Sequence, residues 1–407
     1  MDRRTVLKGA SGIVATSALA GCLGGDEGSA DDMSMWYDLS EGEEQSLDQW
    51  ISTFEEENDK VISTEAQGSL QDRIETAVAS GDGPEMWPWA HDWVGSHWNR
   101  GFLTDVSDDL SINVEETFSD PAVEAIHPPG EDAVVGLPGS GETMTMFYNP
   151  DLIDEPPETY SEMVSIAEEH HNPQNGQYGF TQDINVYTFS YALQAFGSRV
   201  LEVDENGEAN LGLEEDGMIR GMELARELYQ YMPADTTYES QIPPFVNGNA
   251  PLHFNGPWAV GDFNNQGASF EIAELPSVEG GEFTPFNGID VWFFSDIVSE
   301  NEDRKATAIE FAEWFTTNEE VVKHYAEEHS YIPVLDSIDQ DALPAQVATF
   351  KSAFDQGIPM PIDARMNQVW GPLEDAMTEV LTADGDIETE FSEAADAIRD
   401  SWSESEE

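Results

Sequence analysis

The stretch that decides the fold is GDGPEMWPWAHD, residues 81–92, which places two tryptophans and a carboxylate directly after a glycine-rich turn. Its glycines and first proline favour a turn, so the apolar run of residues 86–89 predicts a short strand. The next apolar residues recur at helical spacing as far as Gly101, a residue typical of a helix C-terminus. Trp89 and Asp92 are therefore predicted at a junction between a strand and a helix, where open α/β sheets bind their ligands.

The residues before this stretch repeat the same order of strand and helix. Residues 33–37 and 61–67 have the composition of strands. Apolar residues at helical spacing predict one helix around residues 47–54 and another around residues 70–78. This alternation predicts an α/β fold in which a mostly parallel sheet is covered by helices on both faces.

The composition indicates a folded protein with an unusual charge. A chain of 407 residues is long for one core, so two domains or lobes are expected, and 39% hydrophobic residues exclude a disordered protein. Asp and Glu number 83 against 15 Lys and Arg, and the net charge of -68 excludes nucleic acid as a partner. Because the acids are spread along the whole chain, they indicate adaptation to high salt, which screens their repulsion.

Residues 1–22 are predicted to be an export signal that ends in a lipobox. Arg3 and Arg4 begin it, and the mildly apolar stretch that follows is too short to span a bilayer as a helix. The paired arginines resemble a twin-arginine signal, and Leu-Ala-Gly-Cys resembles a lipoprotein processing site with Cys22 as the lipidated residue. An ordinary secretory signal with an incidental cysteine is the alternative. A linker, residues 23–34, would follow the signal.

The middle of the chain contains a Gly-Ser-Gly-Glu segment that ends at Glu142. Extended segments are predicted on its two sides, at residues 133–138 and 143–148. The motifs for a nucleophilic serine or a phosphate loop are incomplete here, so we interpret the segment as a crossing between lobes. Further along, the sequence predicts a strand whose end presents Trp258 and one long helix over residues 305–328.

Two patterns of potential metal ligands are assigned to other roles. His170 and His171 are adjacent, so they point to different faces of a helix and cannot share a zinc ion easily. Asp204, Asn206 and Glu208 alternate as calcium ligands do, but the remaining ligand positions are missing and a solvated hairpin turn fits better. We therefore expect no metal and no other cofactor.

Four blocks of the sequence resemble one family in content and in order. They are GDGPEMWPWAHDWVGSHWNRGFLTDV from Gly81, FYNPDLIDEPPETYSEM from Phe147, FNGPWAVGDF from Phe254 and MPIDARMNQVW from Met360. The chain resembles an extracellular solute-binding protein of the maltose and maltodextrin-binding type, the receptor component of an ABC importer, over residues 35–402. The resemblance implies a periplasmic-binding-protein-like fold, in which two α/β lobes joined by a hinge close around a sugar.

The resemblance also implies domain boundaries and a binding site. The N-terminal lobe would comprise residues 35–140 and 290–341, and the C-terminal lobe residues 141–289 and 342–404. The implied ligand-binding residues are Trp89, Asp92, Trp93, Glu142, Asn185, Tyr187, Trp258 and Trp370. These residue types suit a carbohydrate, because sugar rings stack an apolar face on flat aromatic side chains and donate hydroxyl hydrogen bonds to carboxylates.

Four departures from the family pattern bear on the ligand. Trp93 stands where the family has a basic residue, Asn185 stands where it has a glutamate, and Gly371 stands where it has a second aromatic residue. The lysine that the family has near the end of the first strand is missing from Ser40-Glu41. With these changes the predicted ligand is still a carbohydrate, but the sequence does not identify it as maltose. Trp98 and Trp292 are interpreted as core residues.

The leading functional prediction is a monomeric receptor, anchored by lipid at the outer face of the cytoplasmic membrane, that hands a carbohydrate to a membrane permease. It binds without turnover. The alternative is a secreted glycoside-acting enzyme that uses Asp92 and Glu142 as acid and nucleophile. A surface adhesion protein is a third class, which repeats or a long low-complexity stalk would indicate, and the sequence has neither.

Overall fold

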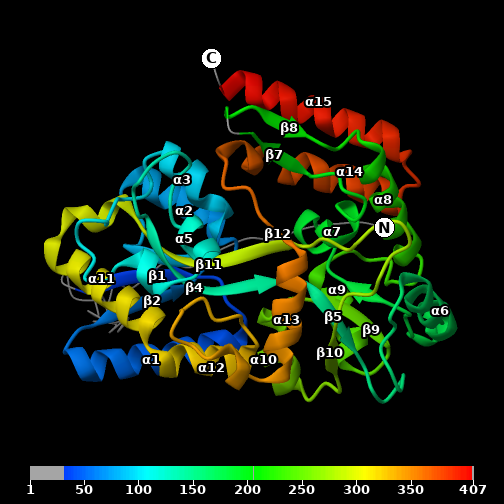
Figure 1. The fold of residues 1–407 in the computed structure, drawn as a ribbon, viewed down its shortest axis with the longest axis horizontal. Coiled ribbons are helices and arrows are strands. Elements are labelled where there is room, and N and C mark those ends of the chain that lie inside the picture. The colour runs from blue at the N-terminus through cyan, green and yellow to red at the C-terminus, as the bar shows by residue number, and fades with distance from the viewer. Residues whose placement is uncertain (1–31, 205, 406–407) are drawn as a thin grey trace, which may run out of the picture.

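Two main sheets divide the molecule into two lobes that lie side by side (Figure 1). The computed structural model describes residues 32–204 and 206–405. In Figure 1, strands β1, β2, β4 and β11 lie in the left-hand lobe, and β5, β9 and β10 lie in the right-hand lobe. Each lobe has a hydrophobic core of its own. The two-lobed α/β fold expected from the sequence is confirmed.

The sheet of the first lobe is built around the strand that the opening stretch predicts. Its order is β12-β11-β3-β1-β2, and β4 pairs with β11. β1 runs parallel to β2 and β3, whereas β11 runs antiparallel to β3 and β4. The strands are β1 (Met33–Tyr37), β2 (Ile62–Ala66), β3 (Met86–Ala90), β4 (Gly136–Thr143), β11 (Phe286–Phe294) and β12 (Ile358–Pro359).

Helices cover this sheet, and their ends follow local sequence signals. Ser40 and Glu43 form a capping box at the start of α1. Gly81 ends α2 with a φ of 77°, a conformation that glycine adopts without strain. The helices of this lobe are α1 (Glu41–Asn58), α2 (Leu70–Ser80), α3 (Val94–Asn99), α4 (Val114–Thr117), α5 (Asp120–Glu124), α11 (Glu302–Thr317) and α12 (Glu319–His329).

The second lobe contains a four-stranded sheet of order β10-β5-β9-β6 and a separate β7-β8 hairpin. The strands are β5 (Thr145–Tyr148), β6 (Thr181–Gln182), β7 (Leu201–Val203), β8 (Ala209–Leu211), β9 (Leu252–Asn255) and β10 (Glu271–Ala273). The helices are α6 (Tyr160–His170), α7 (Val186–Leu193), α8 (Asp216–Tyr229), α9 (Tyr238–Val246), α10 (Trp258–Gln266), α14 (Trp370–Thr382) and α15 (Ile387–Ser405). Helix α13 (Ala345–Gln356) lies between the lobes in Figure 1.

The prediction of mostly parallel sheets holds for part of the molecule only. β1, β2 and β3 are parallel, but in the second lobe β5 pairs antiparallel with β9 and β10. Among the described strands of that sheet, only β6 and β9 are parallel. A strand buried on both faces has the same continuous apolar sequence in either direction, so the apolar runs do not reveal strand direction.

Three further expectations are corrected by the structure. The Gly-Ser-Gly-Glu segment lies inside β4, because β11 pairs along it, with a register shift at Asp290/Val291. The predicted long helix over residues 305–328 is two helices, because Asn318 ends α11 and its side chain accepts a hydrogen bond from the Glu320 amide at the start of α12. Trp258 begins α10 instead of ending a strand.

The chain crosses between the lobes at the end of β4. Met144 alone separates β4 from β5, so one residue divides a strand of the first sheet from a strand of the second. The crossing therefore lies at Met144, two residues after Glu142, and not in the Gly-Ser-Gly-Glu segment itself. The ends of the strands that carry candidate ligand contacts are therefore held close to the junction of the lobes.

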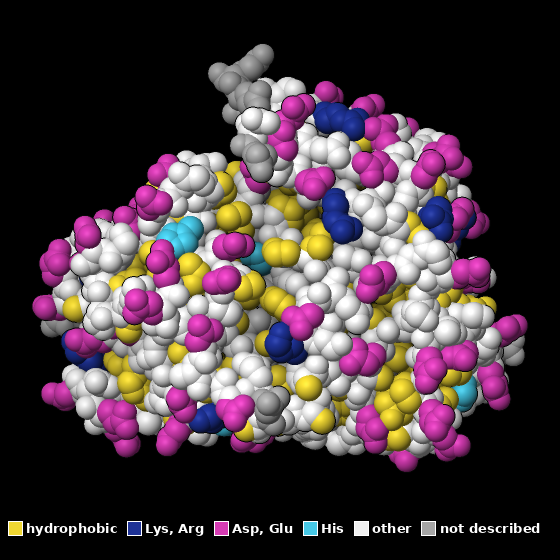
Figure 2. Space-filling model, in the orientation of Figure 1, with side chains coloured by type: hydrophobic (Ala, Val, Ile, Leu, Met, Phe, Trp, Pro, Cys, Tyr) yellow, Lys and Arg dark blue, Asp and Glu magenta, His cyan; other side chains and the backbone are white. Residues whose placement is uncertain are grey.

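Acidic side chains are spread over the visible face of both lobes in Figure 2. This distribution agrees with the even spread of acids along the sequence. Hydrophobic side chains reach the surface near the middle of the same face, between the lobes.

The predicted export signal and Cys22 lie outside the described residues. β1 begins at Met33, so the first strand takes the last two residues of the predicted linker, 23–34. Within residues 32–204 and 206–405, no helix has both the length and the apolar character needed to cross a membrane.

Candidate functional site

Trp89 reaches the junction of the lobes from the carboxyl end of β3. Its ring is partly exposed and stacks on Trp93, with ring centroids 4.9 Å apart and planes 25° apart. Trp93 itself is only 2% exposed. Trp93 therefore lies behind Trp89 and holds its orientation. The tryptophan that replaces the family's basic residue at this position is thus buried.

Asp92 follows in the same turn and contacts the other lobe. It is 6% exposed and accepts a hydrogen bond from the Trp370 side chain at the start of α14. Burial raises the pKa of Asp92 from 3.8 to about 7, and the Trp370 hydrogen bond opposes this rise. Asp92 and Trp370, which lie far apart in the sequence, are thus brought into direct contact.

His91 fixes the position of this turn against neighbouring segments. The Ile289 amide donates to Nδ1 at 3.1 Å, so Nδ1 carries no proton and Nε2–H donates to the Met360 carbonyl, also at 3.1 Å. Burial lowers the pKa of His91 to about 4, which keeps the ring neutral. This role could not be predicted from the sequence, since a histidine at a strand end has many possible partners.

The helix after the turn packs closely on the segment that carries Trp370. A Cβ on Gly95 would lie 2.0 Å from the Ile362 carbonyl oxygen, so only glycine permits this approach. Asn367 Nδ2 donates to Ser96 Oγ at 2.6 Å across the same contact. The segments that contribute Asp92 and Trp370 are therefore held in contact by close packing and by a hydrogen bond.

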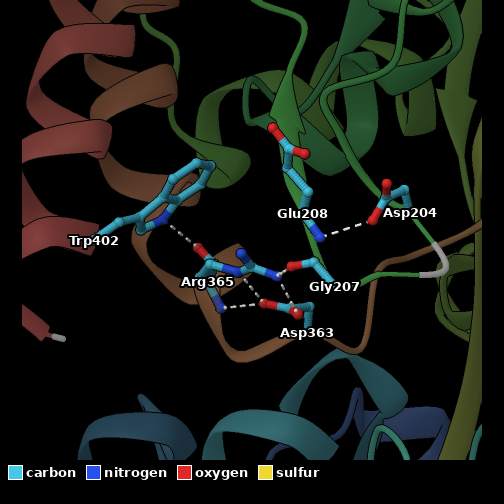
Figure 3. A network of polar contacts seen from close by, with 6 residues as sticks. All are labelled: Asp204, Gly207, Glu208, Asp363, Arg365 and Trp402. Atoms are coloured by element: carbon cyan, nitrogen blue, oxygen red, sulfur yellow. Dashed lines mark hydrogen bonds and ion pairs between the residues drawn. The ribbon is translucent and has the colours of Figure 1, made fainter.

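Arg365 organises the beginning of that segment (Figure 3). Its guanidinium pairs with both carboxylate oxygens of Asp363, at 2.8 and 2.9 Å, and donates to the Gly207 carbonyl at 2.9 Å. Trp402 Nε1 donates to the Arg365 carbonyl at 3.1 Å. One arginine thus connects the segment before Trp370 with the β7-β8 hairpin and helix α15.

Figure 3 also shows the turn that resembled a calcium loop. Asp204 Oδ1 accepts from the backbone amides of Asn206 and Glu208, at 2.9 and 2.8 Å, so this carboxylate closes the hairpin turn. In the described part of the chain, no group of three or more His, Cys, Asp or Glu residues has the geometry of a metal site. The adjacent His170 and His171 instead bond backbone carbonyls.

Glu142 lies on β4, opposite Gly288 of β11. Asp290 pairs with Ser140, two residues before Glu142, so the two carboxylates lie on one face of the strand pair. Burial and the nearby charges of Asp290, Glu43 and Asp92 raise the pKa of Glu142 well above its ordinary value. Burial likewise raises the pKa of Asp290 to about 7.

No described Lys or Arg lies within ion-pair distance of Asp92, Glu142 or Asp290. A site for an anion would need such cations. These three carboxylates therefore suit a neutral ligand that donates hydrogen bonds to them.

Tyr187 and Trp258 form the aromatic side of the second lobe. Their ring centroids are 6.0 Å apart and their planes are 48° apart. The Tyr187 hydroxyl is buried without a hydrogen-bond partner among the described residues, and its pKa is raised well above its ordinary value by burial and by the charges of Glu142 and Asp92. Tyr187 of the second lobe thus lies close to two carboxylates of the first lobe.

Asn185 is committed to the backbone of its own helix. Its Oδ1 accepts from the Thr188 amide at 2.9 Å, and its Nδ2 donates to Asp183 at 2.6 Å. The structure therefore brings six of the eight residues together at the junction of the lobes. Trp93 lies behind Trp89, and Asn185, which is partly exposed, caps α7. Those six are Trp89, Asp92, Glu142, Tyr187, Trp258 and Trp370.

Sequence reasoning missed two carboxylates beside this group, Glu43 and Asp290. Glu43 is 4% exposed and accepts a hydrogen bond from Tyr331 at 2.6 Å. A signal was present in each case: Glu43 completes a Ser-x-x-Glu capping box, and Asp290 interrupts the apolar strand sequence FNGIDVWFF.

The chain is similar to several known proteins. A model of the family described as bacterial extracellular solute-binding protein matches residues 49–352. A maltotriose-binding protein of Pyrococcus abyssi is 32% identical over 331 residues, which cover 79% of this chain and 71% of the relative. A galactooligosaccharide-binding protein of Bacillus subtilis is 25% identical over 370 residues, 86% of this chain and 85% of the relative.

A solved structure supports the same fold. The Thermus thermophilus maltotriose-binding protein, solved with maltotriose, superposes with a TM-score of 0.82 at 22% identity and covers 91% of this chain and 100% of its own. With a family model that spans most of the sequence, the chain belongs to the bacterial extracellular solute-binding proteins.

Proposed function

We propose that the protein is the carbohydrate receptor of an ABC importer and that it binds a maltodextrin-like oligosaccharide between its lobes. The observation that carries this proposal is the grouping of Trp89, Trp258 and Trp370 around the carboxylates Asp92 and Glu142. Aromatic rings offer faces for sugar rings to stack on, and unpaired carboxylates accept hydrogen bonds from sugar hydroxyls. Relatives named for maltotriose and galactooligosaccharide binding support the ligand class.

Closure of the lobes is the proposed binding event. The lobes would comprise residues 35–140 with 290–341 and residues 141–289 with 342–404. A ligand that touches Trp89 in one lobe and Trp258 in the other favours the closed state, because it has more contacts there. The contact between Asp92 and Trp370 would form part of the closed arrangement.

The proposed setting is the outer face of the cytoplasmic membrane. The protein would leave the cell by the twin-arginine route, be held by a lipid on Cys22 and deliver its sugar, as a monomer, to the permease. A relative in Streptococcus pneumoniae, described as a maltooligosaccharide ABC transporter solute-binding lipoprotein, is 23% identical over 397 residues and supports this setting.

Calorimetric titration with maltotriose and galactooligosaccharides in molar KCl tests the proposal. We expect saturable binding to the wild-type protein and a loss of about tenfold or more in affinity for Trp258→Ala, since stacked aromatic side chains often dominate a binding site. Trp98→Ala is the matched control, because Trp98 is also partly exposed but packs against the hydrophobic core of the first lobe. Equal effects of the two substitutions would contradict the assigned site.

We also propose that the protein does not hydrolyse its ligand, although Asp92 and Glu142 have the residue types of a glycosidase. The relatives are described as binding proteins. Chromatography of the sugar after prolonged incubation is the direct check. Release of shorter sugars that Glu142→Gln abolishes would instead establish the enzyme.

A further inference from the structure

A recess lies inside the first lobe, and none of the six grouped residues lines it, although Glu142 lies near enough for the charges of Asp290 and Glu43 to act on it. Ser140 and Asp290, which face each other on β4 and β11, form one side of it, and Glu43 and Trp292 also line it. Its volume is about 50 Å³, several times the 10–15 Å³ that one water molecule needs. The recess can therefore hold more than a single water.

The recess contains a hydrogen-bond donor that is not used by the protein. Trp292 is 3% exposed, and its Nε1–H has no partner among the described residues. A Cβ on Gly139 would lie 2.8 Å from Trp292 Nε1 and 3.2 Å from Asp290 Oδ2. The indole donor and the carboxylate acceptor thus converge on one point, which stays open because residue 139 is glycine.

The acceptors of the recess are Asp290 and Glu43. Glu43 already accepts from the Tyr331 hydroxyl at 2.6 Å and from the Ser40 amide at 3.0 Å. Asp290 has no described hydrogen-bond donor within reach in the protein, and none of the lining residues is Lys or Arg. An anion would be repelled by these carboxylates, and a bare cation would be repelled by the partly positive N–H of Trp292.

Apolar side chains form the remaining wall. Phe315 of α11 and Val321 and Val322 of α12 line the recess together with Leu39. Donor, acceptors and an apolar wall in one small space match a molecule with hydroxyl groups on a carbon frame. The hydroxyls can donate to Asp290 and Glu43 and accept from Trp292, while C–H groups contact the apolar wall.

We propose that this recess, at about 50 Å³, is a second binding position for a hydroxyl-bearing group smaller than one sugar ring, of the size of a hydroxymethyl group. The inference rests on the proposed carbohydrate function and extends it, because none of the eight residues assigned from the sequence lines the recess. The group belongs either to a free small polyol or monosaccharide or to the end of a longer sugar that reaches past Glu142. Both have the same hydroxyl chemistry.

Three variants isolate the recess. Trp292→Phe removes the indole N–H and keeps an aromatic ring, and Asp290→Asn removes the charge with little change of shape. Trp87→Phe is the matched control, because Trp87 is fully buried on the neighbouring strand β3 and also has an Nε1–H without a described partner, but it does not line the recess. Circular dichroism and thermal unfolding verify that each variant folds.

Each variant is titrated calorimetrically with glycerol, glucose, maltotriose and galactooligosaccharides in molar KCl. We expect Trp292→Phe to weaken at least one probe about fivefold, the effect of one hydrogen bond, and Trp87→Phe to leave every affinity unchanged. An effect on glycerol or glucose identifies a free small ligand, and an effect on the longer sugars alone identifies the end of a chain. If Trp292→Phe fails to fold, Asp290→Asn provides the same comparison.

Two results would overturn the inference. If maltotriose or galactooligosaccharides bind and Trp258→Ala weakens them, but neither recess variant changes any affinity, the recess is not a binding position and the proposed function stands. If Trp87→Phe weakens binding as much as Trp292→Phe does, the effect is a general one of altered packing. Failure of every probe to bind the wild-type protein would instead remove the proposed function itself.

Discussion

Asp92→Asn is expected to stabilise the protein at neutral and basic pH while it weakens ligand binding. Asp92 is 6% exposed, and burial raises its pKa from 3.8 to about 7. Above pH 7, this rise in pKa means that keeping the carboxylate ionised in the folded protein costs about 4 kcal/mol relative to the unfolded chain. Because the folded-state pKa is the higher one, the free energy of unfolding is unaffected below the ordinary pKa and falls as the pH rises toward 7.

Asparagine has no charge to bury, so the difference in unfolding free energy between variant and wild type should depend on pH. We expect it to be near zero at about pH 4 and to reach several kcal/mol, at most about 4, at about pH 8. The negative charge of Asp92 also raises the pKa of Glu142, so its removal acts in the same direction. Urea unfolding in molar KCl, followed by tryptophan fluorescence at several pH values, measures this difference.

Asp363→Asn is the control of opposite sign. The Asp363 pKa is lowered, with the hydrogen bonds and charge of Arg365 outweighing burial. This carboxylate therefore stabilises the fold above its ordinary pKa, and its loss should destabilise the protein at about pH 8. A difference for Asp92→Asn that stays constant with pH, or a loss of stability at about pH 8, would refute the assignment of a strained, ionised carboxylate to Asp92.

Two further predictions concern the contacts that hold the lobes and the aromatic wall. Arg365→Lys keeps the charge but loses the paired contact with Asp363. We expect the unfolding free energy to fall by about 1–2 kcal/mol, measured by urea unfolding. We also expect weaker ligand binding through Trp370, measured by calorimetric titration. Asp262→Ala removes the side chain that accepts a hydrogen bond from the Gly42 amide at 3.0 Å, a contact between α10 of one lobe and the start of α1 of the other. Small-angle scattering with bound ligand should therefore show a larger fraction of open molecules. An unchanged scattering profile would contradict this expectation.

The strand and turn around Trp89 could be predicted from the sequence because local chemistry decides them. Glycines, a proline and an apolar run set the turn before β3. Such signals involve residues only a few positions apart. They locate the elements well even before the three-dimensional arrangement is known.

The burial of Trp93 and the commitment of Asn185 could not be predicted in this way. Trp89 and Trp93 are both tryptophans near one strand end, and only the packing of α3 decides that Trp93 lies behind. Asn185 suits a helix cap as well as a ligand contact, and the competing partners appear only in the folded chain. The break at Asn318 was missed because the apolar spacing continues through it.

The polar groups left unsatisfied at the junction of the lobes and in the recess of the first lobe have a common consequence. Glu142 and Asp290 are held beside other carboxylates, and Tyr187 and Trp292 bury donors without a described partner. Each arrangement costs stability in the protein alone, because a buried polar group without a partner loses its hydration. A sugar that supplies hydroxyl donors and acceptors removes this cost only when it lies between the groups. The proposed sites therefore couple ligand binding and stability through the same atoms, and the ligand that satisfies the most of them at once should raise the unfolding temperature most.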